Sequence, residues 1–266
     1  MRRLELSRSF EKPKIAHMPE ALTIENFGSM EWKKNWAGGW SLLTCTYLGY
    51  QYTKQLKEEL GSCLDVCMFI SHQGYTTAYF QKSDLQRFGA FLVKQIVDDK
   101  QKALLWCDEL KRRTDVILTL MKEQKEKQIG AAVYAEFIEA FYAYGVPHRA
   151  IKVSVDFLPA DLLNELLPKF TEARLYAEPV YAETEIYMQF LARQISEKTG
   201  IDPELILCTT KDEFEQYLKD GTLPKTALLE SRFEASSLLF QNGEYAIFAG
   251  DEVETLEGLM EKAFFH

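Results

Sequence analysis

The stretch "LLFQNGEYAIFAGDEVETLEGLMEKAFFH", residues 238–266, predicts a β-hairpin followed by an amphipathic helix. Apolar runs flank Asn242-Gly243, and Asn-Gly is the pair most typical of the two-residue turn in a hairpin. Gly250-Asp251 then offers an N-cap for the helix. The apolar residues of that helix recur at helical spacing, at Val253, Leu256, Met260 and Phe264. This part of the chain is therefore expected to join a small antiparallel sheet to a helix.

A second hairpin is predicted at residues 64–80, "LDVCMFISHQGYTTAYF". Val66, Met68 and Ile70 alternate with their neighbours as in a strand. Gln73-Gly74 suits the turn, and the run that follows it is rich in β-branched and aromatic residues.

Most of the remaining chain has helical periodicity. Helices are predicted at about 40–60, from a Ser83–Gln86 capping box, from Asp98-Asp99 to about residue 127, at 131–144, at 162–167, at 179–199 and at 210–221. Gly145 and Pro168 are expected to end two of them. Residues 150–157 fit either a strand or a helix, and their helical surroundings favour a helix. The predicted fold class is mainly α, a multi-helix bundle with two small β-hairpins.

The predicted domain organisation is an irregular N-terminal arm at residues 1–30 and a helical domain at residues 31–266. The charge distribution offers one option for dividing that domain into two subdomains near residue 130. Residues 1–130 carry a net charge of +4 and residues 131–266 a net charge of −13, out of −9 for the whole chain. An acidic second half argues against nucleic acid as the main partner. If an anionic ligand binds, the first half is the better place for it.

Composition and motifs exclude several classes of protein. A hydrophobic fraction of 47% and a charged fraction of 27% are those of an ordinary soluble domain, without a transmembrane run or a signal-peptide pattern. The sequence contains no P-loop, no Gly-rich dinucleotide fingerprint and no zincin or nucleophile-elbow motif. Five scattered cysteines suit reduced thiols in a cytoplasmic protein. We predict neither a bound metal nor a cofactor, and no membrane partner.

Aromatic residues, at 13% of the chain, are the candidates for ligand contacts. Trp36, Trp40 and Tyr187 could line an apolar pocket between helices, although aromatic residues at helical spacing also form cores. His72, in the turn "SHQG", is a further candidate, although a polar residue is common in turns.

His148 is the one candidate for covalent chemistry. In "YGVPHRAIKV", Gly145, His148, Ala150 and Ile151 match part of the phosphohistidine signature of the dikinase family. A phosphate carrier needs a nucleophilic imidazole, exposed at a helix start where backbone amides can hold the phosphate. The rest of that signature is missing from this sequence.

The order of these elements resembles the helical middle region of phosphoenolpyruvate-synthase-like proteins, the group that includes rifampin phosphotransferases. The resemblance runs from about Trp32 onward through the first hairpin, through "YAEPVYAETEIYMQFLARQISEKTGIDPELILCTTKDEFEQYL", and through Arg232, the Asn242-Gly243 hairpin and "AGDEVETL". Arg232 matches an arginine before the family's hairpin. It could contact an anion or anchor an internal salt bridge.

The resemblance implies a non-catalytic module, similar to the acceptor-binding region, without the ATP-grasp and phosphohistidine domains. Its expected partner is a small apolar ligand or a companion ATP-grasp or phosphohistidine protein. Two alternatives stay open, a phosphotransfer component with a phosphohistidine at His148 and a structural protein-interaction subunit. The chain is not expected to be an enzyme on its own, but it could be part of a split phosphotransferase.

Overall fold

The computed structural model describes Phe27 and residues 30–264, with side chains up to Met260. The arm predicted at residues 1–30 therefore lies almost wholly outside the described residues, as does the side chain of Phe264. The first elements are β1 (Trp32–Gly38), α2 (Leu42–Tyr50), the π-helical segment η1 (Gln51–Gln55), α3 (Leu56–Leu60), β2 (Val66–His72) and β3 (Tyr75–Gln81). The helical middle consists of α4 (Lys82–Asp98), α5 (Gln101–Gln124), α6 (Ala131–Val155), α7 (Ala160–Ala177), α8 (Pro179–Thr199), α9 (Pro203–Ile206), α10 (Lys211–Asp220) and α11 (Thr226–Glu234). The last elements are β4 (Ser236–Gln241), β5 (Glu244–Ala249) and α12 (Asp251–Phe264).

The fold is mainly α, as predicted, but its strands form one sheet instead of two separate hairpins. The five antiparallel strands are ordered β1-β3-β2-β4-β5. Both predicted hairpins exist, and β2 pairs with β4 from Val66↔Gln241 to Ser71↔Ser236, which joins them. A lone hairpin leaves rows of unpaired backbone groups on its outer edges and is only marginally stable in water. Pairing between segments so far apart in sequence has no local signal.

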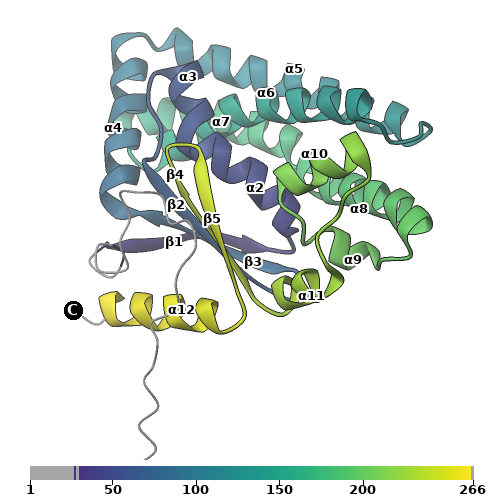
Figure 1. The fold of residues 1–266 in the computed structure, drawn as a ribbon. Helices are drawn as coiled ribbons and strands as arrows, with labels where there is room; N and C mark the ends of the chain where they lie inside the picture. The colour runs from purple at the N-terminus through teal and green to yellow at the C-terminus, as the bar shows by residue number, and fades with distance from the viewer. Residues whose placement is uncertain (1–26, 28–29, 265–266) are drawn as a thin grey trace, which may run out of the picture.

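The sheet is buried on both faces, with most helices on one side and α12 on the other (Figure 1). On β2, Cys67 and Phe69 face the large helical core, whereas Val66, Met68 and Ile70 pack against the α12 side. Two-sided burial explains why β2 reads as a continuous apolar run. None of the helices in the described part of the chain is long and apolar enough to cross a membrane.

Two predicted helix ends are wrong. α6 continues through Gly145 to Val155, so residues 150–155 are helical. A Cβ at Gly145 would lie 2.4 Å from Gln51 Nε2 and 2.6 Å from Arg149 Nη1, so this glycine permits close packing against η1 and does not end the helix. α7 likewise contains Pro168, because the packing of neighbours such as Phe170 outweighs one lost backbone hydrogen bond.

Other local predictions have mixed outcomes. α4 begins at Lys82 after Gln81, so the predicted capping box at Ser83 is wrong. Pro179 does open α8, and Gly200 ends it in the left-handed conformation. The Thr210–Glu213 capping box is present at the start of α10. Residue 130 lies in the loop between α5 and α6, and a subdomain boundary there stays a prediction.

Candidate functional site

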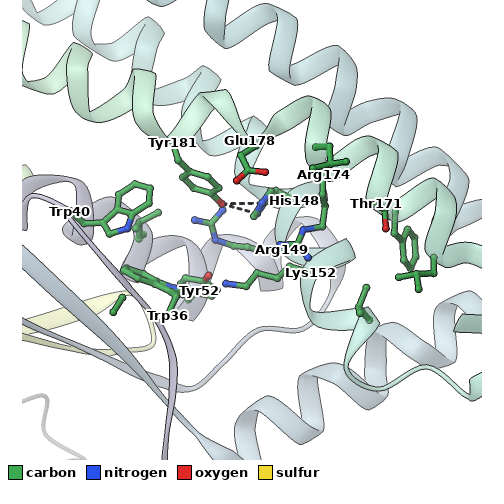
Figure 2. A pocket seen from close by; sticks show the side chains of 16 residues that line it. Trp36, Trp40, Tyr52, His148, Arg149, Lys152, Thr171, Arg174, Glu178 and Tyr181 are labelled. Carbon is green, nitrogen blue, oxygen red and sulfur yellow. Dashed lines mark hydrogen bonds between the residues drawn. The ribbon is translucent and has the colours of Figure 1, made fainter.

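A cavity of about 460 Å³ lies between β1, η1 and the helices α6, α7 and α8 (Figure 2). We call it the Trp–Arg cavity. Its aromatic wall consists of Trp36, Trp40, Tyr52, Phe170 and Tyr181. Its charged side chains are Arg149, Lys152, Arg174 and Glu178. The volume falls within the range that small-molecule pockets occupy, roughly 300–1,000 Å³.

A β-bulge places Trp36 in this cavity. The pairing of β1 with β3 shifts between Lys34 and Trp36, whose partners are Tyr79 and Ala78. Strict alternation would put Trp32 and Trp36 on the same face, but the extra residue of a bulge reverses the side that follows it. Trp32 accordingly packs on the α12 side, and Trp36 packs on the helical side.

The two tryptophans form a continuous aromatic surface with α8. The ring centroids of Trp36 and Trp40 are 5.7 Å apart. Trp40 meets Tyr181 edge to face, with 5.0 Å between centroids. Both indoles are only half-buried and line the cavity, so they can take up a further planar group.

Arg149 is a buried cation in the lining of the cavity, next to its aromatic residues. It is 2% exposed, and its Nη1 donates to the carbonyl oxygen of Gly145 at 3.1 Å. Its guanidinium carbon lies 4.7 Å from the ring centroid of Tyr52, a cation–π contact. Within the described residues, Arg149 makes no salt bridge and its buried Nε has no hydrogen-bond partner. Lys152 follows at i+3 on the same face of α6, and Arg174 comes from α7.

His148 lies beside Arg149 inside α6, not at a helix start. It is 6% exposed, and its Nδ1 is 2.7 Å from the hydroxyl oxygen of Tyr181. Burial and then the charges of Arg149, Lys152 and Arg174 hold the pKa of His148 well below its usual value. Burial raises the pKa of Tyr181. A protonated hydroxyl therefore faces a neutral imidazole at neutral pH, and the hydroxyl can donate to Nδ1.

The structure brings Trp36, Trp40 and His148 together, but it places the other predicted residues elsewhere. Tyr187 is fully buried in the core and donates to Gln124 Oε1 at 2.6 Å. His72 is exposed at the tip of the first hairpin, with Nε2 2.9 Å from Glu257 Oε1.

Arg232 forms an internal salt bridge, the second of its two predicted roles. It is 5% exposed and binds Glu213 through two hydrogen bonds, Nη1 to Oε2 at 2.6 Å and Nη2 to Oε1 at 3.0 Å. It also borders a smaller cavity of about 270 Å³.

Sequence reasoning missed Tyr52 and the three cations as residues of the site. The cations come from residues 149–174, which lie outside the half of the chain that the charge distribution favours for an anionic ligand. A usable signal was present in "VPHRAIKV", where Arg149 and Lys152 interrupt a segment that is apolar apart from His148. A cation on a buried helical face needs a partner.

A larger cavity, of about 840 Å³, lies beside α6 and α10. Its charged residues are of both signs, Glu59, Arg113, Glu139, Glu215 and Lys219. Arg113 is already paired with Glu109 at 2.7 Å. This cavity therefore lacks the concentration of one charge that distinguishes the Trp–Arg cavity.

The five cysteines are buried free thiols. Among the described residues, no group of three or more His, Cys, Asp or Glu side chains could hold a metal ion.

No protein-family model, curated protein or solved structure matches this chain. The resemblance to phosphoenolpyruvate-synthase-like proteins accordingly stays a prediction.

Proposed function

We propose that this protein is a non-catalytic helical module that binds a small molecule with an aromatic or apolar body in the Trp–Arg cavity. The observation that carries the proposal is the pair of half-buried indoles, Trp36 and Trp40, which border a cavity of about 460 Å³. Aromatic walls with a few convergent polar groups are typical of ligand pockets. The sequence predicts an apolar ligand, and the cationic side chains in the lining add that this ligand also has a polar group.

A neutral fluorescent dye tests this function. We expect N-phenyl-1-naphthylamine, which brightens in apolar surroundings, to bind the protein saturably. Trp40→Ala should weaken binding about 10- to 30-fold, since a buried tryptophan anchor contributes about 1.5–2 kcal/mol and 1.4 kcal/mol is tenfold. The measurement is a fluorescence titration, with melting curves recorded to confirm that the variant folds.

The matched control is Tyr75→Ala, which removes an exposed aromatic ring at the start of β3, outside the cavity lining. Its affinity for the dye should equal that of the unmodified protein. Equal binding by the folded Trp40→Ala variant would contradict the proposal, as would an absence of saturable binding.

A phosphotransfer component with a phosphohistidine at His148 is the second candidate. The observation in its favour is that His148 borders the same cavity as a neutral imidazole beside three cations. Incubation with labelled phosphoenolpyruvate should then give an acid-labile label that His148→Ala loses and that Tyr187→Phe, altered in the core, keeps. Labelling that persists in His148→Ala, or no labelling at all, would rule this candidate out.

A further inference from the structure

We propose that the ligand of the Trp–Arg cavity is an aromatic phosphate monoester, with its phosphate against Arg149, Lys152 and Arg174 and its ring against Trp36 and Trp40. This inference rests on the proposed function and names the class of ligand. The indoles of Trp36 and Trp40 lie toward one end of the cavity and Arg174 toward the other, with Arg149 between them against the ring of Tyr52 (Figure 2). The separation suits a molecule with one flat apolar end and one charged end.

The inference depends mainly on Arg149. A second buried arginine, Arg232, shows how this protein stabilises such a side chain by internal pairing. Arg232 is 5% exposed, against 2% for Arg149, and it meets the carboxylate of Glu213 through two hydrogen bonds. Arg149 has only the carbonyl oxygen of Gly145 and the ring of Tyr52, and no carboxylate within salt-bridge distance among the described residues. A buried guanidinium is ordinarily paired with an anion. In Arg149, that anion is supplied by the ligand.

The charge of the cavity wall indicates a dianion. Arg149, Lys152 and Arg174 face one carboxylate, Glu178, which leaves two positive charges among the lining residues. A phosphate monoester carries between one and a half and two negative charges near neutral pH. A carboxylate carries one, and a single arginine fork is enough to bind it.

The state of His148 is consistent with a binding site for an anion. Burial, and after it the three cations, lowers the pKa of His148, so the imidazole adds no positive charge to the site at neutral pH. The hydroxyl of Tyr181 holds the imidazole ring of His148 in place through its contact with Nδ1. Thr171, an exposed residue of α7, adds a hydroxyl to the lining on the side of Arg174.

Three naphthalene compounds test the inference by isothermal titration calorimetry at pH 7.5 and low salt. They are 1-naphthyl phosphate, 1-naphthoate and neutral 1-naphthol, which present the same rings with different charge. We expect the phosphate to bind at least about tenfold more tightly than either of the other two. Inorganic phosphate alone should compete weakly, because it lacks the ring.

Variants assign the preference to the cations. Arg149→Met and, separately, Arg174→Gln should weaken 1-naphthyl phosphate binding more than about tenfold and change 1-naphthol binding less than about twofold. Arg174 is exposed, so its variant tests the site even if the buried substitution disturbs folding. Lys198→Gln removes an exposed lysine from the end of α8, outside the lining, and should change neither affinity.

The outcomes separate this inference from the proposed function. Equal binding of 1-naphthol and 1-naphthyl phosphate would overturn the inference that the ligand carries a phosphate. It would leave the proposal of an aromatic ligand pocket intact. Binding of 1-naphthoate as tight as that of the phosphate would overturn the dianion assignment. If neither these compounds nor the neutral dye binds, the proposed function fails and takes this inference with it.

Discussion

Replacing Glu213 with alanine should lower the free energy of unfolding by about 3–5 kcal/mol, because it leaves the buried guanidinium of Arg232 without its carboxylate partner. Arg232 is 5% exposed, and both of its terminal nitrogens donate to the Glu213 carboxylate. The same carboxylate accepts from the backbone N–H of Thr210 at 2.8 Å and completes the capping box of α10. The alanine variant therefore loses the partner of a buried cation and a helix cap together. Urea unfolding followed by circular dichroism measures the change.

Three further variants make this prediction specific. Glu213→Gln keeps one acceptor oxygen and should lose less stability than the alanine variant. Glu230→Ala removes an exposed carboxylate from α11 and should cost less than about 0.5 kcal/mol. The double variant Glu213→Ala/Arg232→Met should recover part of the loss, because an apolar replacement of a whole buried pair is often tolerated. A loss below about 1 kcal/mol in Glu213→Ala would show that Arg232 is not held as the structure describes.

Phe240→Ala should lower the free energy of unfolding by about 3–5 kcal/mol, the usual cost of removing a buried phenylalanine ring. The ring lies in β4 and is fully buried. Its centroid is 5.1 Å from Tyr245 and 6.1 Å from Phe69. It also covers Gly49 of α2, where an added Cβ would come within 2.2 Å of the ring. This side chain therefore connects the sheet to the helical layer, and its loss leaves a cavity between the two.

A double-mutant cycle with Gly49 tests that contact. Gly49→Ala alone should destabilise the protein, because the new methyl group overlaps a ring that its surroundings hold in place. In the Phe240→Ala background the same change should be neutral or stabilising, since alanine favours a helix by about 1 kcal/mol over glycine and the methyl group partly fills the cavity. Additive losses in the double variant would contradict the packing of Phe240 on α2.

The elements that were predicted correctly share a short-range cause. Asn242-Gly243 forms the turn between β4 and β5, with both residues at positive φ. The side chains of Thr210 and Glu213 each accept a hydrogen bond from the backbone N–H of the other residue. Pro179 fits the first position of a helix. In each case the interacting atoms lie within a few residues, so the signal is present in the local sequence. The mainly helical class follows from the same kind of pattern.

Tertiary packing determined the structure at positions where the local sequence signals are weak or misleading. Gly145 resembles a helix end, but it lies within α6 because Gln51 and Arg149 need the space that a side chain would fill. The bulge after Lys34 turns Trp36 toward the helices, and no residue type announces that shift. Both outcomes depend on atoms from segments that are distant in sequence.

The candidate site divides in the same way. The sequence by itself identified Trp36, Trp40 and His148 as candidate site residues, because aromatic and imidazole side chains have recognisable chemistry wherever they lie. Only the tertiary structure placed them around one cavity with Arg149 and Arg174. The physical reason is that the surrounding chain decides whether a charged side chain is buried and whether it has an oppositely charged partner. Neither property belongs to the residue alone.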